Sequence, residues 1–324
     1  MADFAPAKDK VTEGGKLFDL TRELSWSPWI PHQGCWAGNL IPNTPGLYRI
    51  RRVNGVSLDY IGQSGGGAAT LRLRMGGLRG VYCDEMPYKA PHTAAPALWA
   101  LRSSLGLNFE VSVAPVSCAD DRRIGIEALV IALHRQEHGC SPMANFGRIL
   151  PGFRKSSGVS RKLASAGKQY RGGRSETHEQ HHAPGISPIG KLSGDPLSSD
   201  WCGHRWSNWQ SISSANNKPP NAATGLYRIR DATQPGLLYI GQGKVSPRLP
   251  QHVGMSKIRD NPKGAVFAAA KQLEASWVLD DAWLDNQRLE LECDLIGAYM
   301  LATSSVPLAQ FGGHRGKKEE VGDK

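Results

Sequence analysis

The amino-acid sequence predicts an α+β protein made of two similar domains, each with a small three-stranded sheet flanked by helices. The length of 324 residues suits two domains of ordinary size. Four short blocks of sequence occur twice in the same order, which is the mark of an internal repeat. Each copy also joins a hairpin pattern to segments of helical spacing.

The repeated blocks keep their spacing as well as their order. The two tyrosines of each hairpin are 12 positions apart (60 − 48 and 239 − 227). A glutamate precedes the last block by 18 positions in both copies (145 − 127 and 310 − 292). The blocks are GLYRI at 46–50 and 225–229, YIGQ at 60–63 and 239–242, Trp-Ser-x-Trp at 26–29 and 206–209, and an amide-Phe-Gly triplet at 145–147 and 310–312.

The local patterns place the elements along each copy. Aromatic and β-branched residues predict strands over 46–53 and 57–63, and Asn54-Gly55 between them predicts a tight hairpin turn. Alternating apolar residues predict a third strand over 108–116. Helices are expected over 70–79, 93–105 and 120–138 in the first copy, and over 263–274 and 284–302 in the second.

The domain boundaries follow from the repeats and from a basic stretch between them. The first domain is predicted over 1–150, a Gly/Ser-rich mobile linker over 151–198, the second domain over 199–314 and a charged tail over 315–324. Residues 151–200 carry 8 basic and 4 acidic side chains, whereas the flanking regions are close to balanced. A basic segment of this kind indicates either a polyanion partner or a solvated connector. The cations that precede any acid there are Arg154, Lys155, Arg161, Lys162, Lys168, Arg171 and Arg174.

Other classes of protein are disfavoured by the composition. With 40% apolar and 21% charged residues and no long apolar run, a membrane protein is not expected. The six cysteines form no Cys-x-x-Cys pair, and the amino terminus has no apolar signal core. We therefore expect reduced thiols and a cytoplasmic location, with no structural zinc and no small-molecule cofactor.

The Gly-x-Tyr … Tyr-Ile-Gly hairpin, followed in order by arginine, glutamate and an amide residue, resembles the GIY-YIG nuclease superfamily. The resemblance covers roughly 100 residues of each copy. It implies a domain that hydrolyses phosphodiesters with one divalent ion, Mg²⁺ or Mn²⁺, per active site.

The motif positions carry over residue by residue, and each carries an expected catalytic role. In the first copy they are Tyr48, Tyr60, Arg74, Glu127 and Asn145. In the second they are Tyr227, Tyr239, Arg248, His252, Glu292 and Gln310. Arg72 is a rival to Arg74, and Leu78 stands where the first copy would carry its histidine. Gln310 replaces the expected asparagine, and its longer stem is expected to shift the contact.

These residue types suit phosphodiester hydrolysis. The carboxylates of Glu127 and Glu292 are the expected ligands of a hard, oxygen-seeking cation. Arginine offers a planar fork of donors to phosphate oxygens. Tyr48 could relay a proton from water, but its pKa would first have to be lowered by nearby cations.

The sequence thus predicts a DNA endonuclease, with a restriction or defence role, in which two domains pair within one chain. A homodimer is the expectation if they do not pair. The alternatives are a nuclease of DNA repair or of a mobile element, and a non-catalytic nucleic-acid-binding protein with one or both sites inactive.

Overall fold

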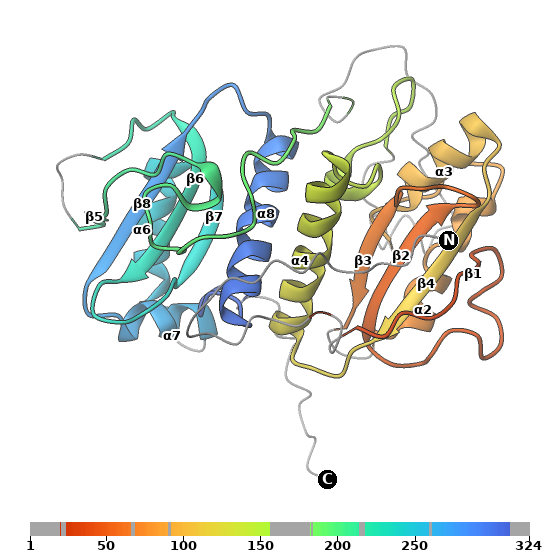
Figure 1. Ribbon diagram of the computed structural model, residues 1–324, viewed down its shortest axis with the longest axis horizontal. Coiled ribbons are helices and arrows are strands. Elements are labelled where there is room, and N and C mark those ends of the chain that lie inside the picture. The colour runs from red at the N-terminus through yellow and green to blue at the C-terminus, as the bar shows by residue number, and fades with distance from the viewer. Residues whose placement is uncertain are drawn as a thin grey trace, which may run out of the picture.

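Two antiparallel sheets lie on either side of a central pair of helices (Figure 1). The structure is a computed structural model, and it describes residues 20, 24–65, 69–89, 92–155, 182, 184–213, 218–258 and 261–311. The central helices are α4 (Asp120–His138) and α8 (Asp285–Thr303). The mixed composition of helices and antiparallel strands confirms the predicted α+β class.

The first sheet has four strands in the order β1-β4-β2-β3. The strands are β1 (Ile30–Pro31), β2 (Gly46–Arg52), β3 (Tyr60–Ser64) and β4 (Phe109–Pro115). Tyr48 is paired with Gly62 on β3 and with Val113 on β4, so β2 is the central strand that carries the first motif.

The second sheet repeats this topology in the order β5-β8-β6-β7. Its strands are β5 (Gln210–Ser211), β6 (Thr224–Asp231), β7 (Tyr239–Lys244) and β8 (Leu273–Leu279). Tyr227 is paired with Gly241 and Trp277, as Tyr48 is paired in the first sheet. The prediction of three strands per sheet was wrong, because β1 and β5 have two residues each and are too short to show a period.

Shorter helices complete each repeat. In the first repeat they are α2 (Leu71–Gly76), α3 (Ala95–Leu105) and the 3₁₀ turns η1 (Arg79–Tyr82) and η2 (Asn145–Gly147). In the second they are α6 (Val245–Met255), α7 (Pro262–Ala269) and the 3₁₀ turn η4 (Trp201–Gly203). No helix within the described ranges is both long and apolar enough to cross a bilayer.

Two predicted elements differ from the structure. The helix expected over 263–274 ends at Ala269, and Leu273 already belongs to β8, whose seven residues are too few for a clear pattern. The turn at Asn54-Gly55 exists, with Asn54 at φ 61°, but β3 begins only at Tyr60. The carboxylate of Asp59 accepts the backbone N–H of Arg52 at 2.8 Å and so ends the ladder before the tight turn.

The arginine of each GLYRI block is held by the tryptophans upstream. The Arg49 guanidinium carbon lies 4.4 Å from the Trp26 ring centroid and 4.8 Å from that of Trp29. Arg228 lies 4.3 Å from Trp206 and 4.7 Å from Trp209 in the same arrangement. These contacts attach the first segment of each repeat to its central strand.

Helices α4 and α8 pack antiparallel. Arg122, at the start of α4, donates to the carbonyl of Ser304 just after the end of α8, and Arg135 near the end of α4 reaches Asp294 at the middle of α8. A Cβ on Gly297 would lie 2.8 Å from the Cβ of Ala132, and these two residues are counterparts in the repeat (297 − 132 and 292 − 127 are both 165). A position that packs on its own counterpart lies on a pseudo-twofold axis.

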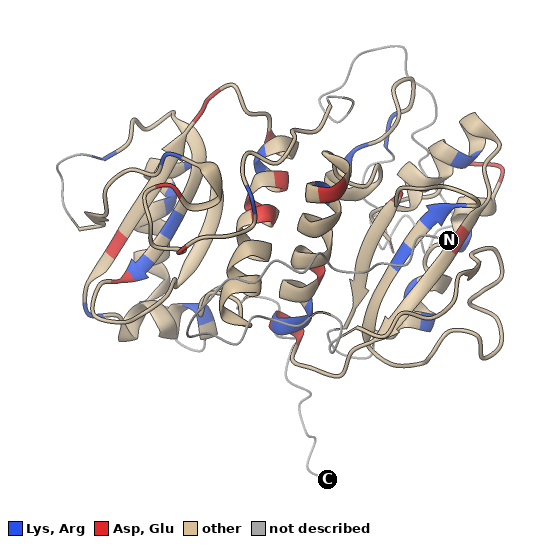
Figure 2. Ribbon diagram, in the orientation of Figure 1, with Lys and Arg blue, Asp and Glu red and all other residues tan. Residues whose placement is uncertain are grey.

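A buried ion cluster joins the two helices near this axis. Both nitrogens of an Arg135 fork bond the Asp294 carboxylate, at 2.7 and 3.0 Å. Glu290 lies 3.6 Å from Arg135 and 3.6 Å from Arg148, and its side chain is fully buried. Figure 2 shows the charged positions on the facing helices. Removing one partner of such a cluster leaves a buried charge uncompensated.

The predicted linker is described only in part. Ile186 donates its N–H to Glu290 at 2.7 Å, and Gln136 donates to the carbonyl of Gly190 at 2.8 Å. The segment that begins at residue 184 is therefore bound to both central helices, where a mobile linker was predicted. Before it, His182 Nε2 is 2.5 Å from the carbonyl oxygen of Phe153.

Candidate active site

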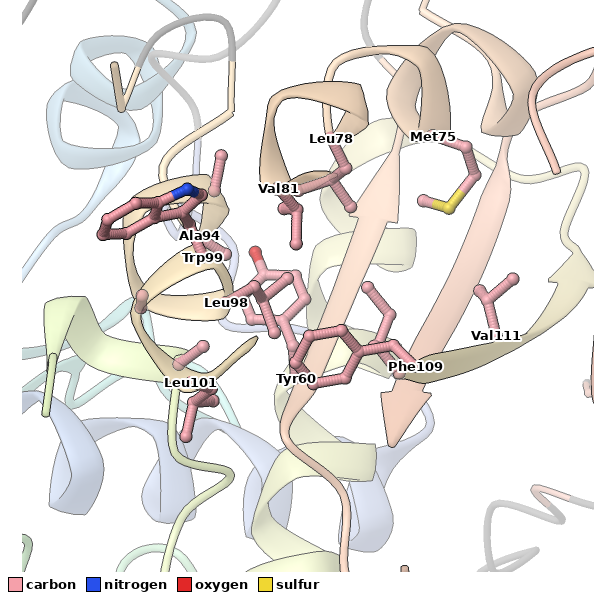
Figure 3. Packing of buried hydrophobic residues seen from close by; sticks show 14 of the residues in the cluster. Tyr60, Met75, Leu78, Val81, Ala94, Leu98, Trp99, Leu101, Phe109 and Val111 are labelled. Carbon is pink, nitrogen blue, oxygen red and sulfur yellow. The ribbon is translucent and has the colours of Figure 1, made fainter. Parts of the chain in front are cut away.

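The two tyrosines of the first repeat lie together on one face of the sheet. Tyr48 on β2 and Tyr60 on β3 have ring centroids 5.8 Å apart, and both side chains are buried. Figure 3 shows Tyr60 among the apolar side chains Leu98 and Val81. A Cβ on Gly62 would lie 2.5 Å from the Tyr48 hydroxyl, so only glycine lets this ring cross β3. A Cβ on Gly241 would collide in the same way with the Tyr227 ring, so this position of the motif requires glycine for steric reasons.

A histidine that the sequence analysis did not assign completes the first site. His92, just before α3, places Nε2 2.6 Å from the Tyr48 hydroxyl. Its Nδ1 accepts the backbone N–H of Ala94 at 3.2 Å. Burial, with Arg74 nearby, holds the His92 pKa well below its usual 6.5. The neutral ring therefore carries its proton on Nε2 and donates it to Tyr48.

The second repeat puts its histidine in the same place from a different element. His252 on α6 has Nε2 2.8 Å from the Tyr227 hydroxyl, and burial lowers its pKa to about 3. The expectation that the first copy lacks an equivalent imidazole was wrong: Leu78 is a buried core residue, and His92 supplies the ring from 14 positions further on (92 − 78). No local spacing signals this exchange.

Arg74 is the arginine that faces the tyrosines. It lies within hydrogen-bonding reach of Tyr48 and acts electrostatically on Tyr60 and Glu127. Its neighbour Arg72 instead donates Nε to the carbonyl of Ile41 at 3.0 Å. Of the two candidates, Arg74 is therefore the one placed with the other predicted residues.

Glu127 on α4 points back toward the hairpin. Burial raises its pKa from 4.5 to about 7, against the lowering influence of Arg74, of a backbone hydrogen bond from Gln63 and of Arg123. Glu292 on α8 has its pKa raised to about 7 by burial, opposed by Arg248 and Lys263. Each site thus holds one carboxyl group whose ionised form a bound cation would stabilise.

An arginine one turn before each glutamate fixes the helix to the hairpin. Arg123 donates to Gln63 at 3.1 Å and pairs with Asp120. Arg288 repeats both contacts with Gln242, at 3.4 Å, and with Asp285. The shared pattern Asp-x-x-Arg-x-x-x-Glu at 120–127 and 285–292 was missed, although it is readable in the sequence.

The side-chain amides of Asn145 and Gln310 are both hydrogen-bonded to backbone groups. Asn145 bonds the N–H and the carbonyl of Ile61, at 3.0 and 2.9 Å. Gln310 makes the same pair of bonds to Ile240, at 3.0 and 3.1 Å. The expected shift from the longer glutamine stem does not occur, because both amides close the same two bonds. This geometry makes them positioning residues for β3 and β7 and gives no support to a direct catalytic role.

The second site brings together the remaining predicted residues. The Tyr227 and Tyr239 ring centroids are 6.0 Å apart, and His252 lies 4.5 Å from Tyr239. Arg248 acts on Tyr227, Tyr239 and Glu292 through its charge. A further cation, Lys263, lies over the Tyr239 ring and was not expected.

The phenols remain protonated in these surroundings. Burial raises the Tyr48 pKa to about 12, and Arg74 lowers it only in part. The Tyr239 pKa is likewise raised to about 12 by burial. Proton loss from Tyr48 therefore needs positive charge beyond what the side chains supply.

The residues present suit a weakly ligated divalent ion. Among the described residues, no group of three His, Cys, Asp or Glu side chains gathers at one point. Mg²⁺ commonly binds through one or two carboxylates plus substrate phosphate and water. A single half-buried glutamate in each site fits that mode of binding.

The predicted nucleic-acid-binding residues are described only at their start. Arg154 is exposed, and Lys155 is half-buried, with its pKa lowered to about 8 by burial and by Lys89. Arg161, Lys162, Lys168, Arg171 and Arg174 lie outside the described residues, as does the tail over 315–324.

Comparisons of the chain with protein-family models, with curated proteins and with solved structures gave no match.

Proposed function

We propose that this chain is a metal-dependent endonuclease that hydrolyses DNA phosphodiester bonds at two sites. The observation that carries the proposal is the convergence of the same groups in both repeats: two tyrosines, an imidazole, an arginine and a half-buried glutamate with a raised pKa. The imidazole comes from different elements in the two repeats, before α3 and on α6. A structural role alone gives no reason for two elements to place the same ring against the same phenol.

Each group has a task in the proposed reaction. Arg74 and Arg248 bind the non-bridging oxygens of the scissile phosphodiester. The Tyr48 oxygen accepts a hydrogen bond from His92, which favours its deprotonated form. Once the phenolic proton has passed to bulk water, the phenolate can take a proton from the attacking water. Glu127 and Glu292 would hold Mg²⁺ or Mn²⁺. Such an ion supplies Lewis acidity toward the phosphate oxygens when it is bound.

The pairing of the repeats fits cleavage of both strands. Two sites related by a pseudo-twofold axis can each take one strand of a duplex, since the strands of DNA are themselves related by twofold axes. The α4 and α8 contact supplies this pairing within one chain. A restriction or defence nuclease is the function that this arrangement suits best.

The direct test is incubation of the purified chain with supercoiled plasmid and Mg²⁺, followed by sequencing of the ends. We expect nicked and linear products, and none in excess chelator. The doubly substituted chain, Glu127→Ala with Glu292→Ala, is the matched control for a contaminating nuclease. Equal cleavage by the control, or full activity in chelator, would refute the proposal.

A further inference from the structure

We infer that Lys263 is a second phosphate-binding residue of the second site, contacting the same phosphodiester as Arg248, and that the first site has no counterpart. The inference rests on the proposed function and adds to it a difference between the two sites. It starts from the position of the Lys263 ammonium, 3.7 Å from the centroid of the Tyr239 ring.

The backbone at Lys263 is fixed next to the site. Asn261 caps α7 by accepting the N–H of Lys263 at 3.1 Å. A Cβ on Gly264 would collide with the carbonyl of Met255, so α7 is packed directly on the end of α6. The Phe267 ring of α7 lies 5.4 Å from His252. The lysine stem therefore starts from a rigid point beside the imidazole.

The ammonium group lies beside site residues, and in the part of the chain that the structure describes no carboxylate forms a salt bridge with it. Its pKa is lowered to about 8, chiefly by burial, and Glu292 and Arg248 act on it electrostatically. Among the described residues, none forms a salt bridge or hydrogen bond with this ammonium. An ammonium has three donors, and an aromatic face satisfies them poorly. Lys263 is only half-buried, and an anionic oxygen bound beside Arg248 would give these donors a charged acceptor in place of water.

The described residues of the first repeat include no equivalent lysine at this position. Helix α3, the counterpart of α7, begins with Ala95 and Pro96 and carries no cation in its first turn. The cations that act on Glu127 are Arg74 and Arg123. Arg123 is already bonded to Gln63 and to Asp120. Counting described residues alone, the first site therefore presents one cation to a phosphate, and the second presents two.

The experiment isolates the second site in a chain that carries Glu127→Ala. In that background, Lys263→Met is compared with Lys257→Met, which removes the same charge from an exposed position after α6. A hydrogen bond to a charged group is worth enough to change kcat/KM by about 10- to 100-fold. We expect that loss in plasmid nicking for Lys263→Met and less than about 3-fold for Lys257→Met. Lys263→Arg, which keeps charge and donors, should retain most of the rate.

Three other outcomes would contradict either the role of Lys263 or the proposed nuclease activity. Equal rates for Lys263→Met and Lys257→Met would overturn the role of Lys263 and leave the nuclease proposal standing. Equal losses for Lys263→Met and Lys263→Arg would show that the side chain acts through packing on Tyr239, which also overturns it. If the Glu127→Ala parent and the unsubstituted chain both fail to nick DNA, the proposed function itself is wrong.

Discussion

His92 donates a hydrogen bond from Nε2 to the phenolic oxygen of Tyr48 over 2.6 Å. The direction of this bond is set by the other ring nitrogen, which accepts the N–H of Ala94. A ring held in this tautomer stabilises negative charge on the phenol and cannot take its proton. His92 is thus a positioning residue that acts through Tyr48.

The first prediction follows from that direction. In a Glu292→Ala chain, where only the first site works, His92→Ala should lower the nicking rate by about 10- to 100-fold, because a hydrogen bond to a developing charge is lost. His92→Gln can still donate from its amide and should keep most of the rate. If the glutamine variant is as slow as the alanine variant, the ring acts as a base and the assigned tautomer is wrong.

The second prediction concerns the pairing of the repeats. Gly297→Ala places a methyl group 2.8 Å from the Cβ of Ala132, and the helices must separate to admit it. We expect the free energy of unfolding to fall by about 1–3 kcal/mol, as for overpacking elsewhere. Gly254→Ala is the matched control, since a Cβ there meets nothing within 4 Å. That change should be neutral or stabilising by up to about 1 kcal/mol. Equal denaturant curves for the two variants would contradict the tight α4–α8 contact.

The third prediction uses the raised pKa of Glu127. Its carboxyl titrates near pH 7 in the folded chain and near 4.5 when unfolded. As the pH rises from 4.5 to 7, the unfolded chain loses this proton first, so the glutamate progressively costs folding stability; above 7 the cost is constant. Glu127→Gln should therefore raise the free energy of unfolding in chelator by an amount that grows over this range, up to about 3 kcal/mol.

The check is denaturant unfolding at pH 5 and at pH 8, with Glu137→Gln as the control. Glu137 is on the same helix but is exposed, and its substitution should change stability little at either pH. A stabilisation by Glu127→Gln that is equal at both pH values would show that the carboxyl is not perturbed by burial.

The parts of the site that recur in sequence were predictable. Tyr48, Arg74 and Glu127 have counterparts in the same order in the second repeat, and the structure brings the three residues together. His92 was not predictable, because its ring replaces one from another helix and the exchange leaves no spacing to detect. Asn145 was assigned by its place in the motif, and only the three-dimensional structure shows that its amide is hydrogen-bonded to the backbone of Ile61.

The pairing of the repeats could be expected but not located from sequence. Local periodicity shows that a helix has an apolar face, but not which face meets which. Asp294 would have been a usable signal, since it directly precedes an apolar run of its helix, whereas Arg135 stands in a polar run that gives no such signal. Buried charges of this kind are paired, and the two residues pair with each other.

The last prediction tests the division of labour between the sites. Glu127→Ala and Glu292→Ala each remove one carboxylate and leave the α4–α8 contact in place, because neither residue is in the ion cluster of Arg135. Each single variant should convert supercoiled plasmid to the nicked circle and stop, and the double variant should do nothing. Wild-type behaviour of Glu292→Ala would make the second repeat a binding module, and the same result for Glu127→Ala would make the first repeat one. In either of these cases the variant still linearises the plasmid with one working site, so the second strand would be cut by another chain.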